Sequence, residues 1–183
     1  MTETTNLAER CKKRDARAQR ELYDLYKSRL MGLCRRYASS REEAQDVLQE
    51  AFIKIFTRFD QLEDTAKLEA WMRKITVNTA VNYYHRARRF VFNDIENVQA
   101  ASGDYEVMMS NISDEYLVRT INSLPDGCRV IFNLFVVEGY NHSEIAEMLH
   151  ITESTSRSQL VYAKGLLKQR LNSQGVLRYE RYA

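Results

Sequence analysis

Residues from Trp71 onward place aromatic, basic and amide side chains on one side of a predicted helix. Trp71, Lys74, Asn78 and Asn82 follow in steps of three and four, and asparagine is a poor helix former that needs a reason there. Such a stripe can hold a phosphate backbone and stack unpaired bases. The alternative, one buried asparagine and a solvated basic face, stays open on the residues alone. The candidate nucleic-acid contacts are Trp71, Lys74, Asn78, Asn82, Arg86 and Arg89.

A second set of candidates lies in residues 154–171, a stretch without acidic side chains. Ser156, Leu160, Ala163 and Leu167 form one helical stripe, which we assign to packing. Short hydroxyls and an arginine near the start of the helix are suited to base edges and phosphates in a major groove. The alternative is a solvent-exposed polar face. The candidate DNA contacts are Ser154, Thr155, Arg157, Ser158, Val161, Tyr162 and Lys164.

A third candidate surface is acidic. Asp46, Gln49, Glu50 and Ile53 share the exposed side of an amphipathic helix predicted from the apolar residues of 47–59. Carboxylates and an amide beside an apolar seam suit a protein partner with basic side chains. An ordinary solvated polar face is the alternative, and the residue types alone favour it.

The elements that position these residues are helical, and they predict two domains. Apolar residues recur at helical spacing over residues 22–37, 47–59 and 71–89, which places a first domain at 1–92. Residues 93–112 are acidic and polar with few apolar residues, so we interpret them as a flexible linker. Twenty residues reach at most ~70 Å. A second domain follows at 113–172, with a tail at 173–183.

The second domain carries the pattern of a helix-turn-helix. A helix is predicted to stop before Pro125, which suits the first turn of the next helix, and that helix ends at Gly139. Asn141 with Glu144 predicts the cap of a short helix. A tight break at 150–152 precedes a longer helix from about residue 154 to 171. A short helix, a brief turn and a longer helix are typical of this DNA-binding motif.

Composition narrows the class of protein. One proline and six glycines in 183 residues suit an all-α chain and argue against a sandwich or barrel, which needs many turns. Three cysteines without a CxxC pair indicate reduced cytosolic thiols, with no disulfide framework or zinc site. The apolar runs are too short for a bilayer, and the N-terminus has no signal-peptide pattern. We expect a cytoplasmic protein without cofactor, metal or membrane insertion.

The net charge of +2 hides a strong pattern along the chain. Residues 1–41 carry eleven basic and five acidic side chains, whereas residues 93–126 carry one basic and seven acidic ones. Residues 71–92 and 154–171 contain basic side chains and no acid, and the acidic stretch lies between them. Two such basic stretches suggest two surfaces for an anion.

Three segments resemble a known family. Residues 46–52 (DVLQEAF) resemble the polymerase-binding region of bacterial sigma factors, and residues 70–80 (AWMRKITVNTA) resemble the region that opens the minus-ten element. Residues 124–149 resemble the region that reads the minus-thirty-five element. The order of the three segments, with no domain between them, is similar to that of the small extracytoplasmic-function (ECF) sigma factors over residues 10–172.

The resemblance implies roles in the first domain. The polymerase contact would fall on Asp46, Gln49 and Glu50, which would engage the clamp helices of the largest catalytic subunit. The strand-opening helix would be residues 71–89, and the base-capturing loop would lie near residues 62–68. The expected partners are core RNA polymerase, promoter DNA and an anti-sigma factor.

In the second domain, the resemblance implies major-groove contacts by Arg157, Ser158 and Val161. Ser156 stands where the family usually has an aliphatic residue, and Gln159 stands where arginine is common. Tyr162 also replaces a common arginine. The resemblance therefore implies a mode of docking on DNA and not a particular promoter sequence.

These expectations amount to a non-enzymatic specificity subunit of RNA polymerase that is monomeric when free. A stand-alone helix-turn-helix regulator is the alternative, but it would need a dimer seam, and the sequence has no heptad pattern for one. An enzyme is disfavoured because the chain has no clustered nucleophile and base, no metal-ligand spacing and no glycine-rich phosphate loop.

Overall fold

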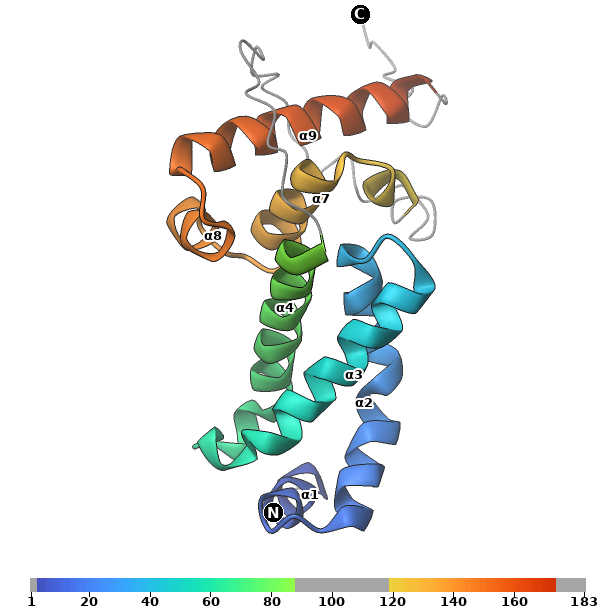
Figure 1. The fold of residues 1–183 in the computed structure, drawn as a ribbon, viewed down its shortest axis with the longest axis vertical. Coiled ribbons are helices and arrows are strands. Elements are labelled where there is room, and N and C mark those ends of the chain that lie inside the picture. Colours follow the sequence, from blue (N-terminus) through green and yellow to red (C-terminus); the bar gives the residue numbers. More distant parts are fainter. Residues whose placement is uncertain (1–2, 88–118, 174–183) are drawn as a thin grey trace, which may run out of the picture. The chain divides into compact units, whose positions relative to one another are not determined.

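The protein is described here by a computed structural model that covers residues 3–87 and 119–173. The chain divides into two compact units, residues 1–88 and 89–183. Both described parts are helical without strands, which confirms the predicted all-α class (Figure 1). The predicted linker, the tail and the boundaries at residues 92 and 112 lie outside the described residues and stay predictions.

The first unit is built from α-helices joined by short turns, two of which are single 3-10 turns. The predicted helices all form, and the helix expected from Trp71 begins three residues earlier. A further helix at the N-terminus was not predicted. In chain order the elements are α1 (Glu3–Lys12), α2 (Ala16–Tyr37), α3 (Arg41–Thr57), η1 (Phe59–Gln61), η2 (Thr65–Lys67) and α4 (Leu68–Ala87).

Local sequence sets where α2 and α3 begin. The Asp15 carboxylate accepts the backbone N–H groups of Arg17 and Ala18 at 2.8 and 3.2 Å. The Ser40 hydroxyl accepts the N–H of Glu43 at 3.1 Å at the start of α3. These caps satisfy amide groups that have no partner within the helix.

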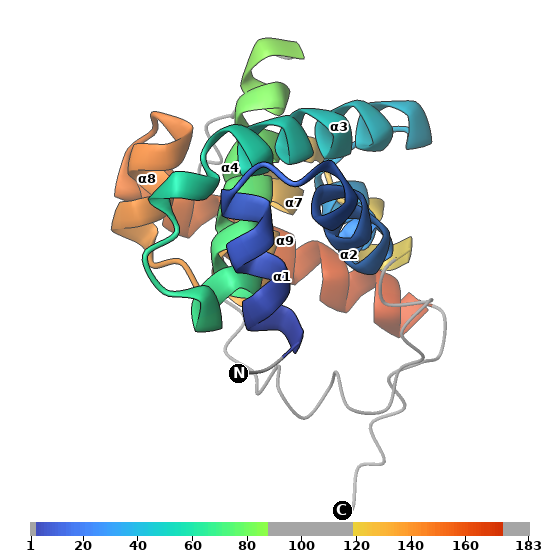
Figure 2. The same ribbon diagram turned by 90° about the horizontal axis from the view of Figure 1, so that it is seen from below.

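The core of the first unit lies where α2, α3 and α4 pack against one another. Its largest fully buried side chains include Leu22, Tyr37, Ile55, Phe59 and Met72. α1 packs on α2 and on both 3-10 turns, at one end of this bundle (Figure 2). Its inner residues Leu7, Ala8 and Cys11 are buried there. The three-helix core therefore fixes the outward faces of α3 and α4.

The second unit contains the predicted helix-turn-helix. Residues 119–122 are helical and stop before Pro125, as predicted. Pro125 is the N-cap of the next helix and does not lie inside its first turn, because its ψ of 142° is extended and the helix starts one residue later. Gly139 comes two residues after the end of the π-helical turn η3 and has a φ of +80°, as its predicted place after a helix end requires. The elements after residue 125 are α7 (Asp126–Phe132), η3 (Asn133–Val137), α8 (His142–Leu149) and α9 (Glu153–Ser173).

Hydrogen bonds define both ends of α8 and the tight turn to α9. The predicted capping box is confirmed, since the Asn141 and Glu144 side chains each accept the other residue's N–H, at 2.9 and 2.8 Å. His150 adopts a left-handed conformation with a φ of 53°. The N–H of Ile151 then returns to the carbonyl of Ala146 at 3.0 Å, which closes the helix end. α8 and α9 both pack against the rest of the unit around this turn.

Candidate functional site

The outward face of α3 presents the predicted acidic patch. Asp46, Gln49 and Ile53 are exposed, and Ile53 shows 63% of its surface although it is a large apolar residue. Val47, Leu48 and Ala51 point into the core on the opposite side. An exposed isoleucine beside a carboxylate and an amide suits a protein contact, because buried apolar anchors with polar rims are typical of such interfaces.

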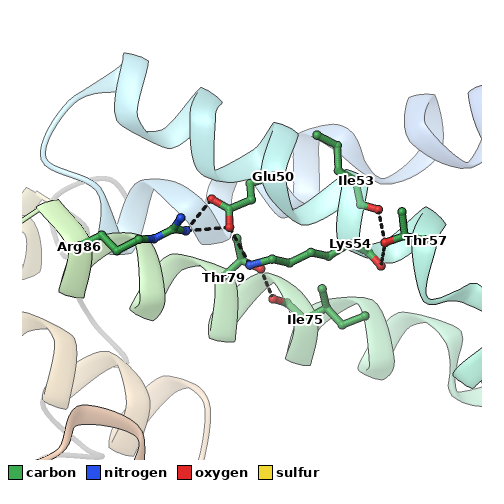
Figure 3. Close-up of polar contacts among 7 residues, drawn as sticks. All are labelled: Glu50, Ile53, Lys54, Thr57, Ile75, Thr79 and Arg86. Carbon is green, nitrogen blue, oxygen red and sulfur yellow. Dashed lines mark hydrogen bonds and ion pairs between the residues drawn. The ribbon is translucent and has the colours of Figure 1, made fainter.

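Glu50 differs from the other three members of this patch. Its side chain is only 29% exposed, and its carboxylate accepts hydrogen bonds from Lys54 at 2.7 Å and from Arg86 of α4 at 2.7 and 2.9 Å (Figure 3). We predicted Glu50 for the polymerase contact and Arg86 for DNA; the structure joins the two side chains in one ion pair. The sequence pattern could not reveal this, because 36 residues separate them.

The environment of Glu50 favours its charged form. Partial burial acts to raise its pKa, but the hydrogen bonds from Lys54 and Arg86 outweigh burial, so the pKa lies below its usual value. The carboxylate is therefore ionised at neutral pH and keeps both cations close to it.

The predicted stripe on α4 is only partly exposed. Lys74 and Asn82 are exposed, whereas Trp71 and Asn78 are half-buried. The Trp71 ring meets Phe59 edge-on, with ring centroids 5.5 Å apart. Arg86 is 64% exposed despite its ion pair, and Arg89 lies outside the described residues. Lys74 and Asn82 are thus the stripe residues most accessible to a ligand.

Two buried threonines of α4 hydrogen-bond within their own helix. The hydroxyls of Thr76 and Thr79 donate to the carbonyls of Met72 and Ile75, one turn back, each at 2.8 Å. This bonding, which Figure 3 shows between Thr79 and Ile75, satisfies polar side chains that are almost completely buried. Sequence analysis did not single out these residues, although a T-x-x-T pair inside an apolar helix is a usable signal.

The segment that leads into α4, residues 62–68, is anchored at both ends. Leu62 and Leu68 are buried. Between them, the Asp64 side chain accepts the N–H of Ala66 at 2.9 Å and starts the turn η2. Glu63 and Lys67 are exposed. A short loop with fixed ends and an exposed middle is suited to meeting a ligand with little further ordering.

On α9 the predicted packing stripe is confirmed. Ser156, Leu160, Ala163 and Leu167 are all buried. Arg157 is exposed, and its guanidinium donates to Glu153, one turn back, at 2.7 Å. Among the other predicted DNA contacts, Ser154 is exposed and the rest are half-buried; these are Thr155, Ser158, Val161, Tyr162 and Lys164.

Two buried polar contacts behind α9 were missed by sequence analysis. Gln159 is 3% exposed, and its amide oxygen accepts the thiol of Cys128 at 2.9 Å, so Gln159 does not reach the outer face. The Ser156 hydroxyl lies 2.9 Å from Nδ1 of His142, whose ring stacks on Phe135. Ser156, which replaces an aliphatic residue, thus has a hydrogen-bonding partner inside the unit.

Burial keeps the three cysteine thiols neutral. Burial raises the pKa of Cys11 and Cys128 to about 11 and that of Cys34 to about 12. All three thiols are free and buried. Burial, followed by the charges of Arg157 and Lys164, lowers the pKa of His142.

Over residues 3–87 and 119–173, no helix is long and apolar enough to cross a membrane.

Comparison with known proteins decides the family. Family models for Sigma-70 region 2 and Sigma-70 region 4 match residues 22–90 and 114–167. The ECF RNA polymerase sigma-E factor of Escherichia coli (strain K12) is 31% identical over 170 residues, 86% of this chain and 88% of that protein. This chain belongs to the ECF sigma factors. The sigma-E factor of Haemophilus influenzae is 28% identical over 177 residues, 90% of this sigma factor and 93% of its relative.

Solved structures share the fold of this ECF sigma factor. CnrH, in complex with the cytosolic domain of CnrY, matches with a TM-score of 0.51 and 18% identity over 93% of this chain and 97% of that one. The sigma factor RpoE of Bartonella quintana, in complex with the anti-sigma factor NepR, matches with a TM-score of 0.51 and 19% identity over 84% and 96%. The region 2 match spans most of α2 and all of α3 and α4, and the region 4 match spans α7, α8 and most of α9.

Proposed function

We propose that this ECF sigma factor binds core RNA polymerase, recognises a promoter and helps to open it, without catalytic chemistry of its own. The observation that carries the proposal is the pairing, in one unit, of an exposed acidic and apolar face on α3 with a basic and amide face on the adjacent α4. The second unit adds a complete helix-turn-helix. The protein acts in the cytoplasm and is monomeric when free.

Core polymerase is contacted by Asp46, Gln49 and Ile53 on α3. The partner is the pair of clamp helices of the largest catalytic subunit, and the exposed Ile53 supplies an apolar anchor. Glu50 contributes at the edge of this patch and exchanges its contact with Arg86 for one with polymerase. The family match over residues 22–90 supports this assignment.

Promoter opening uses α4 and the segment before it. Unpairing bases costs a few kcal/mol per nucleotide, and capture of the extruded base offsets that cost. The middle of residues 62–68 receives the base, while Lys74 and Asn82 hold the neighbouring strand. Trp71 and Asn78 support the strand from their half-buried positions, and Arg86 extends the basic face. Arg89, which lies outside the described residues, stays a predicted DNA contact.

Recognition of the upstream promoter element uses α9. Arg157 and Ser154 are exposed near the N-terminal end of the helix, where side chains of a recognition helix reach base edges. Thr155, Ser158 and Val161 complete that surface. Tyr162 and Lys164 lie further along the helix and contact the backbone. Gln159 makes no base contact, because it is buried against Cys128.

An anti-sigma factor is the further partner that we propose. Both solved relatives were determined in complexes: one with an anti-sigma factor and one with the cytosolic domain of a second protein. An exposed apolar face such as that at Ile53 is shielded in the absence of polymerase by a partner of this kind.

Co-purification and transcription test the proposal together. The tagged full-length chain is expected to retain bacterial core polymerase without DNA, and the assembled holoenzyme is expected to give run-off transcripts from a subset of promoter fragments. A stand-alone regulator would bind a palindromic DNA site and leave core polymerase behind. Failure to retain core polymerase under low salt would therefore overturn the proposed function.

A further inference from the structure

A group of cations at the start of α2 has no role in the function proposed above. Lys13 and Arg14 form the turn between α1 and α2, and Arg17 and Arg20 follow on the first two turns of α2. All four side chains are exposed. They account for part of the basic excess of residues 1–41. We call these four residues the α1–α2 cationic surface.

The acidic side chains around this surface are already paired. Glu9 pairs with Lys12, and Arg10 binds both Asp15 and Glu21. Asp24, one turn further along α2, pairs with Lys27 at 2.6 Å. Within the described residues, none of the four cations forms an ion pair. The charge of Arg20 also acts on Asp24, where after the hydrogen bond and charge of Lys27 it helps to lower the pKa of that carboxyl. The surface nevertheless keeps a net positive charge, and such a surface attracts a polyanion.

The surface lies at the end of the first unit that carries the base-capturing segment. α1 packs against η1, which directly precedes residues 62–68, and against η2, which lies within them. Figures 1 and 2 show α1, the start of α2 and the segment leading into α4 at this same end. The four cations are therefore at the same end of the unit as residues 62–68, separated from them by the contacts of α1 with η1 and η2.

The chemistry of the surface favours DNA over a protein partner. The exposed large apolar residues of the described chain are Tyr23, Leu25, Ile53 and Val136. None lies within residues 12–20, and the two on α2, Tyr23 and Leu25, lie at the edge of the surface, one turn after Arg20. Protein interfaces have apolar centres, whereas phosphate contacts need only well-placed arginine and lysine. We propose that the α1–α2 cationic surface binds the phosphate backbone of promoter DNA next to the base captured by residues 62–68. This inference rests on the proposed function.

The experiment compares two matched double variants in holoenzyme assembled with core polymerase. Arg17→Gln with Arg20→Gln removes two cations of the surface. Arg35→Gln with Arg41→Gln removes two exposed arginines near the other end of α2, one in its last turn and one at the first residue of α3. Arg35 lies ~22 Å along the helix from Arg20. Within the described residues neither arginine forms an ion pair. Affinity is measured against salt concentration on a promoter fragment that the wild-type holoenzyme retains, both as duplex and with the minus-ten region unpaired.

We expect the Arg17/Arg20 variant to lose about two- to tenfold in affinity at low salt. Its salt slope should become shallower by about 1–2 units, since each lost phosphate contact removes ~0.7–0.9 of a unit. The Arg35/Arg41 variant should keep the wild-type slope. Equal slopes for all three proteins, or equal losses in both variants, would overturn the inference.

Binding to core polymerase without DNA separates the remaining outcomes. Wild-type affinity for core polymerase in the Arg17/Arg20 variant supports a DNA contact. A weaker affinity for core polymerase with an unchanged DNA slope would assign the surface to a protein partner and overturn the inference. If the wild-type holoenzyme itself retained no promoter fragment, the proposed function would fail, and that result is distinct from a failure of this inference alone.

Discussion

Glu50 on α3 and Arg86 on α4 form an ion pair in which one guanidinium nitrogen lies 2.7 and 2.9 Å from the two carboxylate oxygens. The pair joins a residue assigned to the polymerase contact with one assigned to the DNA contact. The sequence placed Glu50 on the exposed side of its helix, but in the structure its side chain is only 29% exposed and ion-paired. Reversing its charge would therefore affect the fold as well as the interface. A Glu50→Arg change would place three cations together, with Lys54 and Arg86.

Asp46→Arg is the cleaner test of the polymerase contact. Asp46 is exposed and interacts only with the half-buried Tyr83 of α4 among the contacts that the described residues show for its side chain. Losing this one surface contact should lower the unfolding temperature by only a few degrees, while like charges at the interface should weaken core polymerase binding by tenfold or more. Glu147→Arg, on the exposed side of α8, is the control and should bind core polymerase as the wild type does. If the Asp46→Arg variant bound core polymerase with unchanged affinity, the assignment of α3 to the polymerase interface would be wrong.

The Glu50–Arg86 pair should contribute to stability in a pH-dependent way. The pKa of Glu50 is below its unfolded value, so its contribution is present above about pH 4.3 and is lost as pH falls through the folded pKa. Glu50→Gln should cost at most about 1 kcal/mol at pH 7, and the difference from wild type should shrink toward pH 3. Denaturant unfolding at both pH values measures this, and a difference that grows on acidification would contradict it.

Asn82→Ala should impair promoter opening more than promoter binding. Asn82 is exposed and alanine favours helix, so the fold should be unaffected. Asn78→Ala should act in the same direction, with some loss of stability because Asn78 is half-buried. Permanganate reactivity is compared on duplex and pre-melted promoters. Equal defects on the two templates would argue against a role in opening.

Arg157→Ala should change which upstream sequences are preferred. A bidentate arginine–guanine contact is worth ~1–3 kcal/mol of discrimination, and Arg157 is exposed near the start of α9. Lys168→Ala, about three turns later, should weaken all promoters alike and reduce the salt slope by at most roughly one unit. Selection of randomised upstream elements with each variant distinguishes the two. If the Arg157→Ala variant kept the wild-type preference for upstream sequences, the recognition surface would lie at least one helical turn away from Arg157.

His142 should make the second unit sensitive to acid. Burial first, and then the charges of Arg157 and Lys164, lower the pKa of His142, so the unfolded state takes up a proton at higher pH than the folded state does. Stability should therefore fall as pH drops from about 7 toward 5. His142→Phe should flatten this part of the profile. A variant with the same profile as wild type would assign the pH dependence to other groups.

Features of this protein that depend on neighbours along the chain could be predicted from the sequence. The Asn141–Glu144 capping box, the positive φ of Gly139 and the inward stripe of Ser156 and Leu160 all follow from spacings of three and four residues or from one residue's backbone freedom. The resemblance to sigma factors likewise rested on three short segments, residues 46–52, 70–80 and 124–149, that occur in the family's order. The helical class and the outward face of α3 therefore followed from local patterns alone.

Contacts between distant residues were decided by the tertiary structure. Arg86 reaches Glu50 across 36 positions, and Gln159 reaches Cys128 across 31. No local pattern records these pairs, because packing of whole helices sets which side chains meet. Asn78 illustrates the limit: the sequence placed it on the stripe of Asn82, but only the packing around α4 made one half-buried and the other exposed.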